Sequence, residues 1–225
     1  MKILVVCCLH GDEKFGLRIA KLLTKTPIGG IDFIIGNPKA VAANKRYVDS
    51  DLNRSFRQGE GYEAKRALEI SALFAKYNYV IDIHTTSTDL EMVPIFVSFG
   101  PKSKKILNVL DSKQVVIMPK SKDSLIGAFG NGAVSLEFGD SYCRSNSALH
   151  EVHEFLLKLA SRKERRPKTR EIYRITSLAP PKTKKTACAN FQYSKLLGGY
   201  GFLIGERSYK DFGGFVAQKK QKLVV

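Results

Sequence analysis

Three polar residues lie at the ends of apolar segments, and their types could together bind a metal ion. His10 and Glu13 follow the first apolar run of the chain, and His84 ends another. Two imidazoles and one carboxylate are a common ligand set for catalytic zinc, which keeps a fourth position open for water. Glu137 lies in a third apolar run, and a carboxylate that does not bind the metal could take a proton from that water.

For these residues to meet, the runs that carry them must be neighbouring strands. Six short apolar runs are typical of buried strands, and four longer segments have apolar residues at helical spacing. The predicted strands are 2–9, 31–35, 79–84, 94–99, 115–117 and 133–138, and the predicted helices are 14–23, 62–77, 103–110 and 147–159. This alternation predicts an α/β fold with a mostly parallel or mixed central sheet flanked by helices. In such sheets ligands bind at the carboxyl ends of the strands, which is where these runs place their polar residues.

The order of five short segments is more specific than any single residue. They are His10–Glu13, Asn37–Val41, Arg46–Arg54, Asp82–His84 and Glu137–Gly139. In this order and spacing they resemble the motifs of the succinylglutamate desuccinylase and aspartoacylase family, which belongs to the zinc carboxypeptidase-like clan. The resemblance covers nearly all of residues 1–161 and implies the fold of that clan, with a small β unit packed over the site.

The resemblance implies a role for each chemically active residue. His10, Glu13 and His84 match the family's ligands to one zinc ion, and Glu137 matches the general base that activates water. Arg46 matches the arginine that polarises the amide carbonyl and stabilises the oxyanion that forms during attack.

Three further residues match groups that hold the substrate. Asn53 and Arg54 match the pair that binds the substrate carboxylate, for which a guanidinium can provide two parallel hydrogen bonds. Tyr209 is a weaker candidate, because segment 205–209 resembles the one in which the family places a substrate-contacting tyrosine. Aspartoacylases also carry an arginine shortly before the base for a second substrate carboxylate, and residues 124–131 contain none. The sequence therefore predicts neither of the substrates for which the family is named.

Each of these residues taken alone has a simpler interpretation. A lone histidine at a strand end is more often a packed residue than a ligand, and a glutamate early in a helix is favoured by the helix dipole. Arg46 and Arg54 could instead be ion-pair partners of Asp49 and Asp51. Asp82 could orient a ligand imidazole, or it could be an ordinary surface carboxylate. The joint arrangement is what favours a metal site.

The charge of the chain is unevenly distributed. Of the net charge of +16 over 225 residues, residues 1–160 contribute +4 and residues 161–225 contribute +12. We therefore predict a catalytic domain over 1–161 and a small basic β-rich domain over 162–225. Its predicted strands are 173–178, 201–205 and 215–218.

The basic clusters at 162–170 and 182–185 leave three interpretations open. They could form a solvated surface, bind nucleic acid or another polyanion, or steer an anionic substrate toward the site. No nucleic-acid-binding motif accompanies the charge.

Composition bears on two further classes of protein, membrane-spanning proteins and disulfide-rich proteins. No run of about 18 apolar residues is present, so we expect no membrane span. Four cysteines without a C-x-x-C pair indicate a cytoplasmic protein rather than a disulfide framework. The sequence does not predict an oligomeric state.

Together these features predict a cytoplasmic hydrolase that binds one zinc ion per chain. We expect it to cleave the amide bond of an N-acyl amino acid or a related small carboxylated amide. One alternative is a carboxypeptidase-like enzyme that acts on short peptides with the same zinc chemistry. Another is a polyanion-binding protein that keeps a vestigial metal site.

Overall fold

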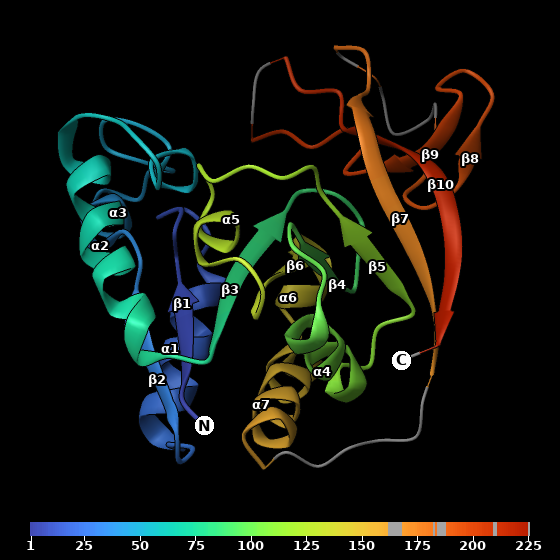
Figure 1. Cartoon of the computed structure of the whole chain (residues 1–225). Helices are drawn as coiled ribbons and strands as arrows, with labels where there is room; N and C mark the ends of the chain where they lie inside the picture. Colours follow the sequence, from blue (N-terminus) through green and yellow to red (C-terminus); the bar gives the residue numbers. More distant parts are fainter. Residues whose placement is uncertain (162–167, 182, 184–187, 209–210, 225) are drawn as a thin grey trace.

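A central β-sheet runs through the molecule (Figure 1). The computed structural model describes residues 1–161, 168–181, 183, 188–208 and 211–224. Within these residues the strand order is β2-β1-β3-β6-β4-β5-β7-β10-β9-β8. The strands are β1 (Ile3–Cys7), β2 (Ile31–Ile35), β3 (Tyr79–Thr86), β4 (Met92–Phe96), β5 (Gln114–Ile117), β6 (Ala133–Gly139), β7 (Thr169–Leu178), β8 (Tyr193–Ser194), β9 (Gly199–Phe202) and β10 (Phe215–Val224).

Parallel and antiparallel pairs both occur in the sheet. Strands β2, β1, β3 and β6 are parallel, whereas β4 runs antiparallel to β6. Strand β5 is parallel to β4 and to β7, and β10 then pairs antiparallel with β7. The predicted mixed α/β fold is thereby confirmed.

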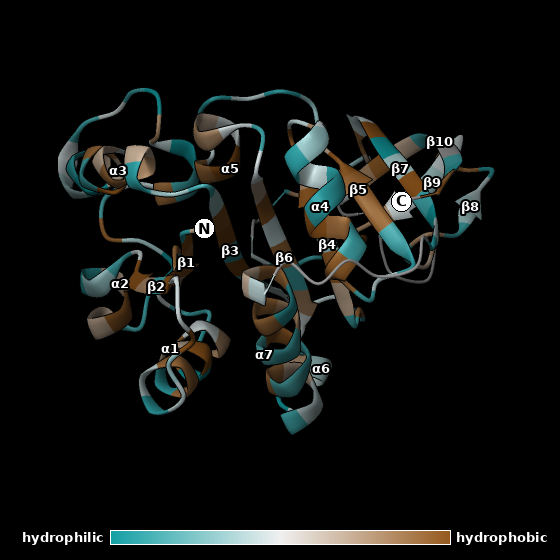
Figure 2. Ribbon diagram, turned by 60° about the horizontal axis from the view of Figure 1, so that its bottom comes forward, coloured by the Kyte–Doolittle hydropathy of each residue, from teal (hydrophilic) through white to brown (hydrophobic). Residues whose placement is uncertain are grey.

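Helices cover both faces of the sheet because alternate residues of each strand point to opposite sides. In β1, Ile3 and Val5 belong to the core on the side of α1 and α7, whereas Leu4 and Val6 belong to the core on the side of α3. Figure 2 shows the hydrophobic strands lying between these helices. The helices are α1 (Phe15–Lys25), α2 (Pro38–Ala43), α3 (Gly61–Leu73), α4 (Pro101–Val109), α5 (Leu125–Phe129), α6 (Asp140–Cys143) and α7 (Asn146–Ser161), with 3₁₀ turns at Leu52–Arg54 and Phe74–Lys76.

The elements that the sequence prediction missed are short and lack an amphipathic stripe, and strands β7 and β10 are longer than the predicted 173–178 and 215–218. Helices α2, α5 and α6 and strand β8 were not predicted. Capping stabilises two of these helices: Asn37 Oδ1 accepts a hydrogen bond from Ala40 N at 3.1 Å, and Ser124 Oγ accepts one from Gly127 N at 3.2 Å. The strand predicted at 201–205 lies two residues earlier and ends at Phe202, because Leu203 adopts a left-handed conformation with φ of 53°.

The C-terminal part continues the sheet of the preceding residues. Strand β7 pairs in parallel with β5, and the last strands form an antiparallel β unit beyond it. The predicted boundary at residues 161–162 adjoins residues outside the described part and stays a prediction. Among the helices that the structure describes, none has the length and hydropathy of a membrane span.

Candidate active site

The three predicted metal ligands converge at the carboxyl ends of β1 and β3. His10 follows β1, Glu13 precedes α1, and His84 lies near the end of β3. His10 Nδ1 lies 2.6 Å from Glu13 Oε1, and His84 Nδ1 lies 3.2 Å from Glu13 Oε2. One ligand atom from each residue can be chosen so that all lie within 4.8 Å of one another. The donor set and its spacing fit a single zinc ion.

The other nitrogen of each imidazole is held by an aspartate. His10 Nε2 lies 3.0 Å from Asp51 Oδ1, and His84 Nε2 lies 2.7 Å from Asp82 Oδ2. Metal-binding histidines are usually held by such a carboxylate, which fixes the tautomer and directs the free nitrogen toward the metal. Asp82 lies where one interpretation of the sequence put it, whereas the contact of Asp51 with His10 was not predicted. The stretch around Asp51 has no periodicity from which its direction could be read.

Opposite charges compensate each other within this buried cluster. Burial alone would lower the pKa of both histidines, but neighbouring carboxylates outweigh it, so the pKa of His10 is raised and that of His84 is raised well above its ordinary value. Burial alone would raise the pKa of Glu13, but the two imidazoles outweigh it and the pKa is lowered. In the metal-free protein the cluster therefore holds an anionic carboxylate between two imidazoles that favour the protonated form, and a metal ion would replace their protons.

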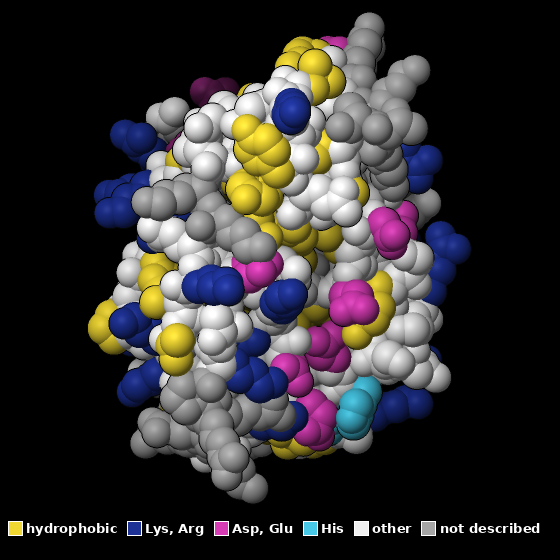
Figure 3. Space-filling model, turned by 90° about the vertical axis from the view of Figure 1, so that its right-hand side faces the viewer, with side chains coloured by type: hydrophobic (Ala, Val, Ile, Leu, Met, Phe, Trp, Pro, Cys, Tyr) yellow, Lys and Arg dark blue, Asp and Glu magenta, His cyan; other side chains and the backbone are white. Residues whose placement is uncertain are grey.

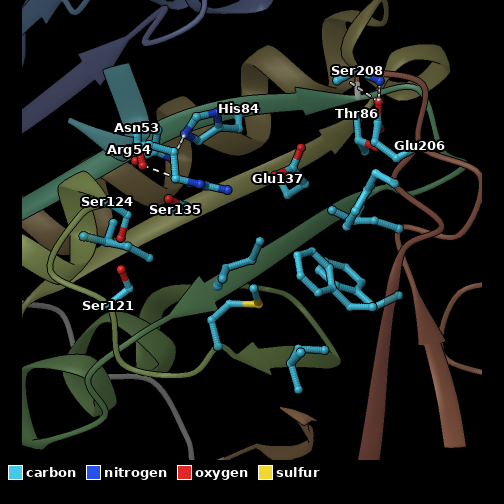
Figure 4. A pocket seen from close by; sticks show the side chains of 18 of the residues that line it. Asn53, Arg54, His84, Thr86, Ser121, Ser124, Ser135, Glu137, Glu206 and Ser208 are labelled. Atoms are coloured by element: carbon cyan, nitrogen blue, oxygen red, sulfur yellow. Dashed lines mark hydrogen bonds between the residues drawn. The ribbon is translucent and has the colours of Figure 1, made fainter. Parts of the chain in front are cut away.

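Glu137 lies beside the cluster and has a different electrostatic environment. It pairs in register with His84 across β3 and β6, and only 9% of its surface is exposed. Burial raises the pKa of Glu137 to about 8, with a smaller opposing effect from His84 and further increases from Glu13 and Glu206. Figure 4 shows its carboxylate between His84 on one side and Glu206 on the other. A carboxylate with a raised pKa beside a candidate metal site is suited to proton transfer.

The predicted substrate-binding residues line the same pocket. Arg46 Nη1 lies 3.3 Å from Glu13 Oε1, so the guanidinium is directed at the cluster. Asn53 Oδ1 accepts a hydrogen bond from Leu125 N at 3.0 Å, and Arg54 donates one to the carbonyl oxygen of Asn53 at 2.9 Å. Figure 4 shows Asn53 and Arg54 together on the side of the pocket nearest His84.

The two aspartates named as alternative partners of the arginines also contact other groups. Asp49 Oδ2 accepts a hydrogen bond from Tyr62 N at 2.7 Å. Asp51 contacts His10 and accepts a hydrogen bond from Asn53 N at 2.8 Å. Pairing of Arg46 and Arg54 with Asp49 and Asp51 therefore stays an alternative interpretation.

A further carboxylate in the pocket, Glu206, was not predicted. Only 7% of its surface is exposed, and it accepts hydrogen bonds from Ser87 N at 2.8 Å, from Ser208 Oγ at 2.6 Å and from the Thr86 hydroxyl. Burial would raise the pKa of Glu206, but these donors outweigh it and the pKa is lowered. Glu206 therefore fixes the C-terminal unit to the end of β3. Tyr209 lies outside the described residues.

The pocket above the cluster has a volume of about 740 Å³ and two kinds of wall. One side is polar and contains Asn53, Arg54, Ser121 and Ser124. The other side is apolar and combines residues at or just after the ends of β4 and β5, one residue of α5 and residues of the C-terminal unit. The apolar residues are Ile95, Val97, Met118, Ile126, Ile175, Leu178, Phe202, Leu203, Phe212 and Phe215.

Polyanion binding by the basic clusters stays a prediction. The clusters at 162–170 and 182–185 fall largely outside the described residues. On the face shown in Figure 3, the lysine and arginine side chains that the structure describes have acidic side chains between them.

Two curated proteins are similar to this chain in amino-acid sequence. A probable aspartoacylase of Trichodesmium erythraeum is 26% identical over 162 residues, which cover 61% of this chain and 55% of that protein. An N-acyl-aromatic-L-amino acid amidohydrolase (carboxylate-forming) of Xenopus laevis is 28% identical over 167 residues, again covering 61% of this chain and 55% of that protein. The chain spans about half the length of the curated relatives it matches.

Solved structures share the fold over the whole chain. Murine aminoacylase 3 superposes with a TM-score of 0.76 at 18% identity, covering 100% of this chain and 97% of that one. The succinylglutamate desuccinylase from Chromobacterium violaceum superposes with a TM-score of 0.73 at 18% identity, covering 99% and 85%. The model of the succinylglutamate desuccinylase/aspartoacylase catalytic domain matches residues 1–160. The chain therefore belongs to the succinylglutamate desuccinylase/aspartoacylase family.

Proposed function

We propose that this chain is a zinc-dependent hydrolase that cleaves the amide bond of an N-acyl amino acid. The observation that carries the proposal is the buried cluster of His10, Glu13 and His84 with Glu137 beside it at the floor of one pocket. When bound there, zinc would act as a Lewis acid and lower the pKa of water.

Residues of the chain bind the substrate, stabilise the oxyanion and transfer the proton. Asn53 and Arg54 hold the substrate carboxylate on the polar side of the pocket, which places the amide over Glu137. Arg46 donates hydrogen bonds to the amide oxygen as negative charge develops on it. Glu137 takes a proton from the attacking water and returns it to the leaving nitrogen, so that an acid and a free amine are released.

The walls of the pocket support an apolar substrate group. Among the described lining residues the cations are Arg46 and Arg54, and both have roles in this proposal. No cation is then left among them for a second substrate carboxylate, whereas the apolar wall can bury a large aliphatic or aromatic group. We therefore propose N-acyl amino acids with an apolar side chain or acyl group. The Xenopus laevis relative named for N-acyl-aromatic amino acids is consistent with this substrate class.

A panel of amides tests the proposal. The zinc-loaded chain should hydrolyse N-acetyl-L-phenylalanine or N-acetyl-L-leucine faster than N-acetyl-L-aspartate and N-succinyl-L-glutamate. Faster turnover of dipeptides would favour the carboxypeptidase-like alternative. Absence of zinc-dependent turnover on every substrate would contradict the proposal.

A further inference from the structure

A buried carboxylate outside the pocket holds the segment from which two site residues project. Glu63 lies in the first turn of α3 and has no exposed surface. Its Oε1 accepts hydrogen bonds from Val48 N at 2.7 Å and from Asn37 Nδ2 at 3.0 Å. Its Oε2 accepts hydrogen bonds from Asp49 N at 3.0 Å and from Ser50 N at 3.2 Å. One side chain therefore binds three successive backbone N–H groups.

The segment that Glu63 holds is flanked by residues that touch the metal cluster. Arg46 precedes it and contacts Glu13, and Asp51 follows it and contacts His10. Because backbone N–H groups at 48–50 are fixed, the positions of both flanking side chains are restricted.

The segment has little packing of its own to hold this conformation. Tyr47 is 40% exposed and Val48 is 43% exposed, so a substantial part of the surface of each residue remains in solvent. Charge-assisted hydrogen bonds to a carboxylate are about twice as strong as neutral ones. Glu63 is thus the principal buried anchor of the segment, although it does not line the pocket.

We propose that Glu63 is a positioning residue, which acts through Asp51 and Arg46 to orient the metal ligands His10 and Glu13. This inference rests on the metal centre of the proposed function and goes beyond it, since Glu63 touches neither metal nor substrate. A purely structural Glu63 would affect the stability of the fold without any specific effect on the metal centre.

The substitution Glu63→Gln tests the contact with little change of volume. The amide would keep one acceptor oxygen and present an NH₂ group in place of the other. Depending on its orientation, either Val48 N and Asn37 Nδ2 or Asp49 N and Ser50 N would lose their acceptor. Loss of groups that orient metal ligands typically costs 10–100-fold in metal affinity. We expect the zinc dissociation constant, measured by chelator competition, to rise about tenfold.

A double-mutant cycle with Asp51→Asn separates positioning from general destabilisation. If Glu63 acts in part through Asp51, the double variant should lose less zinc affinity than the product of the two single losses, because the two effects are coupled. A matched control is Arg170→Met, which removes another buried charged side chain that binds backbone groups. Arg170 is 2% exposed and donates hydrogen bonds to the carbonyl oxygens of Leu107 at 3.1 Å and Leu110 at 2.7 Å, at the end of α4. This control should lower the melting temperature and leave zinc affinity unchanged.

Two outcomes would overturn the inference alone. One is a Glu63→Gln variant with the zinc affinity of the native chain. The other is a double variant whose loss of zinc affinity equals the product of the losses caused by Glu63→Gln and Asp51→Asn alone. If Glu63→Gln does not fold, Glu63→Asp in the same cycle gives the same test, because it keeps the charge but cannot reach both pairs of donors. A native chain that binds no zinc would instead refute the proposed function, and this inference with it.

Discussion

Replacing Glu137 by glutamine should have two opposite effects, one on catalysis and one on stability. Glutamine keeps the shape of the side chain but cannot accept a proton from water. General acid–base catalysis typically contributes 10²–10⁴-fold, so we expect kcat to fall by about that factor. Zinc content should stay that of the native chain, because Glu137 is not one of the ligands in the cluster.

The effect on the stability of the metal-free protein follows from the pKa of Glu137. Burial raises this pKa from 4.5 to about 8, so the folded state favours the protonated acid. As pH rises above 4.5, the unfolded chain loses the proton first, and the folded state becomes progressively less stable until about pH 8. A tenfold change in an acid dissociation constant corresponds to about 1.4 kcal/mol, which gives a cost on the order of a few kcal/mol at pH 8. Glutamine removes that cost.

Thermal unfolding of the chelated protein between pH 5 and pH 8 measures this effect. The variant should match the native chain near pH 5 and exceed it by several degrees at pH 8, at about 2–4 °C per kcal/mol for a chain of this size. A variant that keeps native kcat, or a difference in melting temperature that does not change with pH, would refute the assignment of Glu137.

Three further predictions address the metal, the oxyanion and the apolar wall. The pKa of His10 and of His84 is raised in the metal-free protein, so zinc must displace protons. The affinity for zinc should therefore fall as pH decreases, and calorimetry in buffers of different ionisation enthalpy should detect proton release. Arg46→Ala should lower kcat about 10²–10³-fold, the usual loss for an oxyanion donor, and a native rate would exclude that role. Met118→Arg adds a cation to the apolar wall. The ratio of kcat/KM for N-acetyl-L-phenylalanine to that for N-acetyl-L-aspartate should then fall by about tenfold or more. An unchanged ratio would mean that this wall does not contact the substrate.

The sequence was sufficient to predict the fold class and the main strands of the central sheet. Strand residues such as Val5 and Ile81 lie in uninterrupted apolar runs because both faces of the sheet are covered, and that pattern is visible without a structure. The sequence also placed His10, His84 and Glu137 at strand ends, from which their convergence at one edge follows.

The missed features depend on contacts between distant segments. Asp51 lies 41 residues from His10, and Glu206 lies 120 residues from Thr86. Neither residue belongs to a periodic pattern, so the direction of its side chain could not be inferred. The apolar wall was also not predictable, because Met118 and Phe202 look like ordinary core residues until the C-terminal unit is placed over the sheet.

The central claim is that His10, Glu13 and His84 hold one zinc ion. Elemental analysis of the purified chain, beside His84→Ala, tests this most directly. We predict about one zinc per chain, lost in the variant while its circular dichroism spectrum stays native. A native chain that contains no zinc even after zinc is supplied, or a variant that retains it, would contradict the account.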